Sequence, residues 1–323
     1  MNKKITFVLV LAVAALLVMG SASAGLFDFL GGGDDTVTIG YLKSDHDAAL
    51  FVADAQGQFK DKGINTELVP FNNGGDLMTA MASGDVDVGY AGITPVMASI
   101  SQGVPAKVIS GVQIEGSAIV VTNDSGIESA QDLAGKTIGT PGDASIQHML
   151  LLYYLDQNGL SEDDLNISAM KVPSMVDAIN TGNLDGMITF EPYASLAESQ
   201  GHKVLVGSDE IIPEHPCCVV VASQAFLDEH PDVAKNISEI HANATEFINE
   251  NIKANTTDKV VELLPDDVAL DSDVEVASIS QIEYISGLDD DYKQKVMDFM
   301  NVEVDLGVLK APLDESDIFW DGS

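Results

Sequence analysis

The two cysteines of this chain are adjacent, and their spacing limits what they can do. They end the segment Glu214-His215-Pro216-Cys217-Cys218. A disulfide between neighbours is disfavoured because their Cα atoms lie about 3.8 Å apart across a trans peptide. That separation is below the lower limit of about 4.4 Å for ordinary bridges. We therefore expect two free thiols.

Two explanations for these thiols are open. Thiolates together with imidazoles suit soft or borderline metals such as Zn, Cu(I) or iron–sulfur species. His46, at the start of one predicted helix, and His148, in the first turn of another, supply imidazoles, and Asp45 is a further candidate ligand. Alternatively, Cys217 and Cys218 point to opposite faces of a strand, one in the core and one in a cleft, and each histidine only hydrogen-bonds at its helix start. Convergence of these side chains would decide between the two.

The first 35 residues indicate export. Residues 1–24 carry two lysines, then an apolar run and a small-residue Ala-Ser-Ala end, which is the pattern of a secretory signal. We expect 1–24 to be a signal peptide, cleaved or retained as an anchor, and 25–35 to be a flexible lead-in. The protein is then secreted and works outside the cytoplasm, at the outer face of the cell membrane. Free thiols are unexpected in that compartment.

The chain is strongly acidic and contains no arginine. Its formal net charge is −36, and all 15 of its basic residues are lysines. Such charge disfavours nucleic acid and anionic lipid as partners. Without a guanidinium fork, an anionic ligand would have to be held by helix N-termini, hydroxyls, amides or lysine.

A long segment of the chain occurs twice. Residues 76–103 recur without a gap as residues 174–201, with Asp87 in the first copy matching Asp185 in the second. Both copies predict a helix, an extended segment around the Asp, a turn and a second helix, with glycine at the helix ends. We therefore expect two related α/β lobes that flank a ligand-binding cleft.

Strands and helices alternate through most of the chain and become mainly helical after residue 224. We assign the first lobe to 36–120 and 215–323, the latter including a helical C-terminal region, and the second lobe to 121–214. Strands are predicted at 37–42, 66–71, 86–90, 107–112, 118–121, 137–140, 168–172, 203–206 and 218–222, and helices at 46–62, 75–83, 94–102, 144–158, 225–252, 256–264 and 272–301.

The chain resembles the extracellular solute-binding proteins of nitrate/sulfonate/taurine-type ABC importers in four segments, which are 40–64, 84–103, 126–151 and 190–201. The resemblance implies an α/β, bilobal type II periplasmic-binding-protein fold with two lobes joined by a two-strand hinge. It also implies capture of a small solute by lobe closure, recognised by a membrane ABC permease. Such a protein is a monomeric carrier that needs no cofactor and catalyses no reaction.

Ligand contacts are implied at the turns after strands, where helix N–H groups point into the cleft. For an oxyanion such as a sulfonate or nitrate, the expected donors are the N–H groups of 92–94 and 142–145 and the side chains of Thr94, Ser145 and Lys43. Tyr90 and Phe190 are the expected walls. The alternative solute is a metal or metal–sulfur species held by the His and Cys residues named above. The expected ligand-binding residues are Lys43, Ser44, Asp45, His46, Asn73, Gly74, Tyr90, Gly92, Thr94, Thr140, Gly142, Ser145, His148, Glu191, His215, Cys217 and Cys218.

An enzyme is the third reading of the sequence. Enzymes that make the thiamin pyrimidine share this fold and use a His together with a Cys-rich run. This chain has two adjacent Cys instead of a longer cluster, and it carries an export pattern. It shows no P-loop, dinucleotide fingerprint or nucleophile–base pair. We therefore expect a carrier, which should lack turnover.

Overall fold

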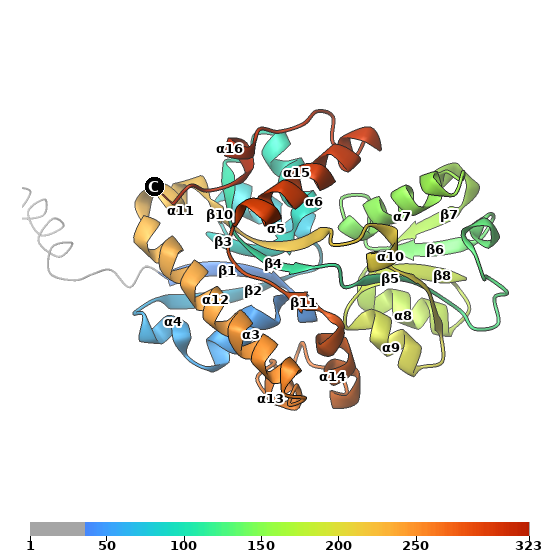
Figure 1. Cartoon of the computed structure of the whole chain (residues 1–323), viewed down its shortest axis with the longest axis horizontal. Coiled ribbons are helices and arrows are strands. Elements are labelled where there is room, and N and C mark those ends of the chain that lie inside the picture. Colours follow the sequence, from blue (N-terminus) through green and yellow to red (C-terminus); the bar gives the residue numbers. More distant parts are fainter. Residues whose placement is uncertain (1–35, 323) are drawn as a thin grey trace, which may run out of the picture. The chain divides into compact units, whose positions relative to one another are not determined.

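Two mixed β-sheets organise the computed structural model, which describes residues 36–322 (Figure 1). The residues from Val37 onward form one unit. The signal peptide and lead-in that we predict for 1–24 and 25–35 lie outside the described residues. Among the residues that are described, no helix is long and apolar enough to cross a membrane.

The first sheet has six strands in the order β11-β4-β10-β3-β1-β2. β1 runs parallel to β3, whereas β10 is antiparallel to its neighbours β3 and β4. In β10, Val219 and Val221 pack into one apolar cluster and Val220 and Ala222 into another. Burial on both faces explains why this strand is a continuous apolar run in the sequence. The strands are β1 (Thr36–Leu42), β2 (Asn65–Phe71), β3 (Val88–Gly92), β4 (Ala106–Ile114), β10 (Pro216–Ser223) and β11 (Glu283–Tyr284).

Helices cover both faces of this sheet (Figure 1). α5, α6 and α15 share an apolar cluster with one face, and α3 and α12 share a cluster with the other. The helices of this lobe are η1 (Asp45–Asp47), α3 (Ala48–Ala55), α4 (Gln58–Asp61), α5 (Gly74–Ser83), α6 (Ile93–Ser101), α11 (Gln224–Glu229), α12 (Pro231–Lys253), α13 (Asp258–Val261), α14 (Ser272–Gln281), α15 (Asp290–Asp305) and α16 (Glu315–Ile318).

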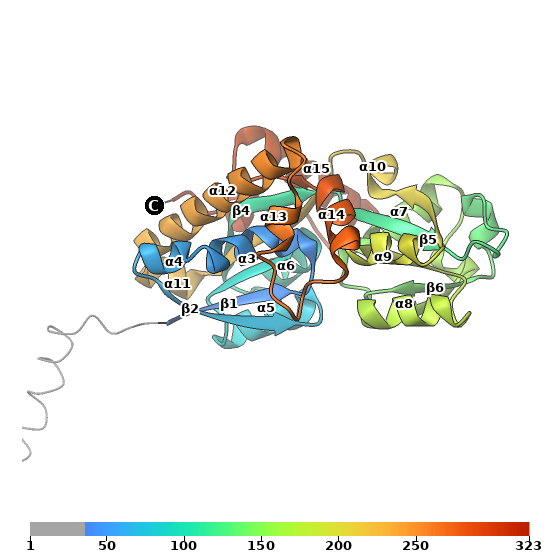
Figure 2. The same ribbon diagram turned by 90° about the horizontal axis from the view of Figure 1, so that it is seen from below.

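The second sheet has five strands in the order β7-β6-β8-β5-β9. α8 and α9 cover one face and α7 covers the other, as Figure 2 shows for α7 and α8. The elements of this lobe are β5 (Ser117–Val121), η2 (Ala130–Leu133), β6 (Thr137–Thr140), α7 (Ile146–Gln157), η3 (Glu162–Asp164), β7 (Asn166–Ala169), α8 (Val172–Asn180), β8 (Gly186–Phe190), α9 (Tyr193–Ser199), β9 (Lys203–Gly207) and α10 (Ser208–Ile211).

The repeated segment folds in the same way in both lobes. It forms α5–β3–α6 in the first copy and α8–β8–α9 in the second. β3 lies between a parallel and an antiparallel neighbour, and so does β8. The shared aspartates also match: Asp87 accepts the Thr38 N–H at 2.9 Å, and Asp185 accepts the Thr137 N–H at 2.8 Å. Each Asp ties the start of its strand to the start of the parallel neighbour.

The chain crosses between the sheets twice. One crossover joins β4 to β5 through Glu115 and Gly116, and the other joins α10 to β10 through 212–215. The Glu115 N–H donates to the His215 carbonyl at 3.1 Å, and the Glu214 N–H donates to the Glu115 carboxylate at 2.6 Å. The two crossovers are therefore bonded to each other, which makes them the two-strand hinge that the resemblance implied.

Four predicted boundaries differ from the structure. The helix predicted at 225–252 is divided into α11 and α12 at His230, because Pro231 begins the second helix. The helix predicted at 46–62 is divided into η1, α3 and α4. The helix predicted at 272–301 is divided into α14 and α15, because Glu283 and Tyr284 add a short edge strand to β4. The first lobe, which we ended at residue 120, ends at Ile114, because β5 pairs within the second sheet. Local patterning cannot show which sheet a short apolar strand joins.

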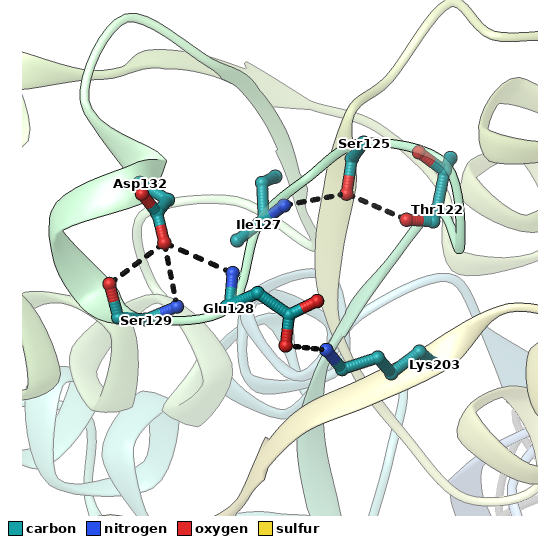
Figure 3. Close-up of polar contacts among 7 residues, drawn as sticks. All are labelled: Thr122, Ser125, Ile127, Glu128, Ser129, Asp132 and Lys203. Carbon is teal, nitrogen blue, oxygen red and sulfur yellow. Dashed lines mark hydrogen bonds and ion pairs between the residues drawn. The ribbon is translucent and has the colours of Figure 1, made fainter.

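The loop between β5 and β6 is fixed by its own side chains (Figure 3). Asp132 accepts the Ser129 N–H at 3.0 Å, and this pair forms a capping box at η2. The Ser125 hydroxyl donates to the Thr122 carbonyl at 2.6 Å. Lys203 of β9 pairs with Glu128 at 2.6 Å. These contacts hold the loop against β9, away from the residues that line the cavity described below, and stabilise the fold of the second lobe.

Candidate functional site

A cavity of about 210 Å³ lies where strand ends of both sheets meet. The first lobe lines it with residues of the turns after β1, β2 and β3, and the second lobe with Phe190 and residues of the turn between Pro141 and Gln147. Cys217 and Cys218, at the start of β10, complete the wall. The cavity therefore occupies the cleft that the repeat predicted.

Three potential metal ligands converge on this cavity. The Nδ1 atom of His46 lies 3.7 Å from the Sγ atom of Cys217 and 3.7 Å from that of Cys218, and the two Sγ atoms are 4.0 Å apart. Around a tetrahedral zinc ion, ideal bond lengths place two sulfurs about 3.8 Å apart and a sulfur and a nitrogen about 3.6 Å apart. The three donor atoms all lie within 4.8 Å of one another and are therefore spaced closely enough to bind one ion.

The pairing of β10 is irregular where both thiols reach the cavity. The pairing of β10 with β4 shifts register between Pro216 and Cys218 and again between Cys218 and Val219. Bulges re-aim side chains that would otherwise alternate. The Cys218 N–H donates to the Gln113 side chain at 2.8 Å, which holds the irregular backbone. Both thiols line the cavity, whereas our alternative placed only one of them in the cleft, and Cys217 also packs in the apolar cluster of Val219 and Val221.

The backbone fixes the orientation of His46. Its Nε2 atom lies 3.0 Å from the carbonyl oxygen of Gly116 in the hinge. A carbonyl only accepts hydrogen bonds, so Nε2 carries a proton and Nδ1 faces the two thiols, donating to a thiolate when the ring is charged and offering its lone pair when the ring is neutral. A carbonyl partner on the far nitrogen is the usual support of a metal-binding histidine. Ser44 caps the same turn by accepting the His46 N–H at 3.1 Å.

The ionisation of the three groups favours one thiolate. Burial opposes ionisation of Cys217, but the hydrogen bond from Cys218 and the charge and hydrogen bond of His46 lower the pKa of Cys217 well below its usual value. The hydrogen bond to Cys217 and burial raise the pKa of Cys218. Burial opposes the charge of His46, but the Cys217 thiolate outweighs it and raises the pKa of the ring. A metal ion would replace the shared protons.

Two carboxyl groups, Asp47 and Asp143, line the cavity, and one of them is deeply buried. Burial raises the pKa of Asp47 to about 8, although the carboxyl accepts the Leu42 N–H at 2.8 Å. Asp47 is therefore largely protonated at neutral pH. Sequence reasoning missed Asp47 and also Gln147, which lines the cavity from the first turn of α7. Their positions just after strand ends were the available signal.

Comparisons with known proteins agree with this architecture. The profile of the NMT1-like family matches residues 31–265. The chain belongs to the NMT1-like family. It is 30% identical over 202 residues to the taurine-binding periplasmic protein of Escherichia coli (strain K12), covering 62% of each chain. It is 27% identical over 217 residues to the 4-amino-5-hydroxymethyl-2-methylpyrimidine phosphate synthase of Aspergillus parasiticus, again over 62% of each chain. The matched part thus spans about 62% of the length of these relatives.

Solved structures show the same fold. The zinc-bound ligand-binding component of an ABC-type import system from Staphylococcus aureus has a TM-score of 0.75 at 24% identity, covering 88% of this chain and 96% of that one. The alkanesulfonate-binding protein SsuA from Xanthomonas axonopodis pv. citri, bound to MOPS, has a TM-score of 0.74 at 18% identity, covering 88% and 98%. This NMT1-like chain therefore has the bilobal periplasmic-binding-protein fold, and its resemblance to taurine- and sulfonate-type binding proteins is confirmed.

Several residues that we expected at the ligand do not line the cavity. Lys43 instead pairs with Asp267 at 2.8 Å. The Tyr90 ring belongs to the core, with its hydroxyl 3.3 Å from His241 Nδ1. Thr140 is fully buried in β6. The expected residues outside the lining are Lys43, Asp45, Tyr90, Thr94, Thr140, His148, Glu191 and His215, and those within it are Ser44, His46, Asn73, Gly74, Gly92, Gly142, Ser145, Cys217 and Cys218.

Two helix-start residues of the expected set serve the fold. The Thr94 hydroxyl donates to the buried carboxyl of Glu303 on α15. The Nε2 atom of His148 lies 3.9 Å from Glu162, outside the cavity. His148 therefore does not join the metal-ligand group, and the four-ligand set that we expected is reduced to three. Its neighbours Ile146 and Gln147 line the cavity, but His148 does not.

The other three misplaced residues make buried hydrogen bonds. Asp45 accepts from the Ser278 hydroxyl of α14. Glu191 accepts from the N–H and the hydroxyl of Ser195, each at 3.0 Å, at the start of α9. The Nδ1 atom of His215 lies 2.9 Å from the carbonyl oxygen of its own turn, and its ring stacks on Phe299. Sequence position alone could not separate these supporting roles from ligand contacts.

Proposed function

We propose that this chain is the secreted, monomeric solute-binding subunit of an ABC importer, working outside the cytoplasm at the outer face of the membrane. Its solute contains a soft or borderline metal ion, bound by His46, Cys217 and Cys218. The convergence of these three donor atoms in the cleft carries the proposal. Family membership and the names of the relatives support the importer role.

The types of the donor atoms limit which metal ions this site can bind. Two sulfurs and an imidazole nitrogen suit Zn²⁺ or Cu(I). Mg²⁺ and Ca²⁺ prefer oxygen ligands, so these three side chains would bind them poorly. The zinc named for the Staphylococcus aureus structure agrees with this choice.

Lobe closure would complete binding. The Ser44 hydroxyl donates to the Glu191 carbonyl of the second lobe at 2.9 Å, and the Tyr193 hydroxyl donates to the Lys43 carbonyl at 3.3 Å. These contacts hold the turn that carries His46 against the second lobe. A solute between the lobes would add contacts to both and favour this closed form, which the permease would recognise.

A small oxyanion is the second candidate solute. α5, α6 and α7 all begin beside the cavity, at Asn73, Gly92 and Ser145, and helix starts leave N–H groups for anions. Relatives are named for taurine and alkanesulfonate. Against it, no lysine lines this cavity among the described residues. A pyrimidine-synthase activity is less favoured, because the chain carries two Cys rather than a longer cluster and an export pattern.

The test is zinc titration of protein purified without oxygen, by calorimetry and native mass spectrometry. We expect one Zn²⁺ per chain and loss of more than about 100-fold in affinity in the Cys217→Ser/Cys218→Ser double variant, beyond what loss of an outer-shell partner costs. Lys310→Gln, at an exposed lysine that does not line the cavity, is the control and should bind zinc within about twofold of the wild type. Unchanged zinc affinity in the double variant would sink the metal proposal, and taurine, alkanesulfonates and nitrate would then be titrated.

A further inference from the structure

The metal ligands leave one coordination position open to the cavity. Zinc-like ions in proteins take four ligands. His46, Cys217 and Cys218 supply three, and all three belong to the first lobe. Because the same three side chains line the cavity, the fourth position faces into it, toward Phe190 and Gln147 of the second lobe. Phe190 also lies beside the His46 ring, with ring centroids 5.7 Å apart, so a group at the fourth position would lie between the two lobes.

The space is far larger than an ion requires. The cavity of about 210 Å³ greatly exceeds the roughly 10–15 Å³ of the same measure that one water molecule needs. A second cavity of about 200 Å³ adjoins it and shares Leu42, Asn72 and Phe190 as lining residues. Both spaces have mainly uncharged walls. An organic group of several atoms fits beside the ion.

The adjoining cavity provides positive charge. Lys43 lines it from the first lobe and Lys171 from the second. Lys43 is paired with Asp267. Lys171 is exposed, and none of the ion pairs among the described residues involves it. In a chain with a formal charge of −36, an unpaired ammonium group beside an aromatic-lined cavity is a specific place for an anion.

We propose that the solute is a metal ion already complexed by a small organic anion. The ion binds His46, Cys217 and Cys218, the organic part fills the remaining cavity, and its acidic group reaches Lys171. The inference rests on the proposed function and adds the co-ligand to it. In this proposal the second lobe contacts the organic part and not the ion. The complex would therefore stabilise the closed form, and the free ion would not.

The experiment uses zinc-loaded protein in oxygen-free buffer and three thiol probes that can each take the open position. They are 3-mercaptopropionate, which carries a carboxylate, 2-mercaptoethanesulfonate, which carries a sulfonate, and neutral 2-mercaptoethanol. We expect at least one anionic probe to bind about fivefold or more tighter than the neutral one, as an ion pair would give. Native mass spectrometry checks that protein, zinc and probe form one complex.

Lys171→Gln separates this inference from the proposed function. The variant should bind zinc as the wild type does and lose the preference for anionic probes, whereas Lys310→Gln, at an exposed lysine that lines neither cavity, should keep it. Equal binding of all three probes, or an unchanged preference in Lys171→Gln, overturns the inference while the zinc site stands. Failure of the wild type to bind zinc refutes the proposed function itself and the inference with it.

Discussion

Replacing Gly116 by alanine tests how the hinge positions the metal ligand. Gly116 lies in the crossover from β4 to β5 with a φ of 81°, in the left-handed region. Its carbonyl oxygen lies 3.0 Å from His46 Nε2, and a Cβ added to Gly116 would lie 2.6 Å from the same nitrogen. The substitution therefore strains the backbone and also pushes the imidazole away from its partner.

The two effects have separate magnitudes. A side chain in the left-handed region costs about 1–2 kcal/mol of stability. Loss of an outer-shell partner of a metal-binding histidine typically costs about 10–100-fold in metal affinity, which is about 1.4–2.7 kcal/mol of binding free energy. We therefore expect Gly116→Ala to unfold at lower urea concentration and to bind zinc at least about tenfold more weakly than the wild type.

Gly126→Ala is the matched control. Gly126 has a φ of 70°, and an added Cβ would meet nothing within 4 Å. It carries the same kind of backbone strain without touching His46. Urea unfolding should show a similar loss of stability in both variants, and zinc titration should show a loss of affinity in Gly116→Ala alone. If both variants bind zinc as tightly as the wild type, the Gly116 carbonyl does not orient His46 for zinc binding.

Three further predictions concern the lobes. Asp87→Ala and Asp185→Ala should each lower the free energy of unfolding in urea by about 1–3 kcal/mol, because each removes the charged partner of a strand N–H; a loss in only one variant would deny their equivalence. Burial raises the pKa of Glu303 from 4.5 to about 8, so the folded protein keeps a proton that the unfolded chain releases, and stability falls as pH rises across that window. Glu303→Gln should flatten this decline between pH 5 and 8, and an unchanged pH profile would contradict it. Gly92→Val should disfavour the closed form, because an added Cβ would already lie 3.0 Å from the Ile146 side chain across the cleft and valine adds two further methyl groups; X-ray scattering should show a larger radius of gyration than the wild type, and an unchanged radius would contradict this.

The sequence predicts the architecture well where the information is local or repeated. The match of 76–103 with 174–201 predicts two related lobes, and the paired roles of Asp87 and Asp185 confirm that match at the level of single hydrogen bonds. The sequence alone cannot show which sheet β5 joins, and it does not predict β11, because both strands depend on pairing with distant strands. Tertiary partners decide these elements, not periodicity.

For the candidate site, too, the sequence predicts the residue types but not their positions in space. The residue types of His46, Cys217 and Cys218 indicate metal ligation from the sequence, but their convergence occurs at an irregular pairing of β10 that strand periodicity does not predict. His148 matches the same chemical pattern and lies beside Glu162 instead. A residue near the end of a strand is a candidate, and its side-chain direction decides whether it is a ligand.

The placement of all three donors on the first lobe separates metal binding from lobe closure. Because His46, Cys217 and Cys218 all belong to the first lobe, the proposed ion would bind to that lobe before the cleft closes, and the contacts of the His46 turn with the second lobe would form on closure. The hinge is nevertheless involved, since the Gly116 carbonyl orients His46 and the irregular pairing begins where the second crossover enters β10. The ion would then sit at the hinge, where closure moves the ligands least, while the rest of the solute lies deeper in the cleft, where the lobes move most. In such an arrangement the first lobe would determine the affinity for the ion, and closure of the two lobes would select the complete solute.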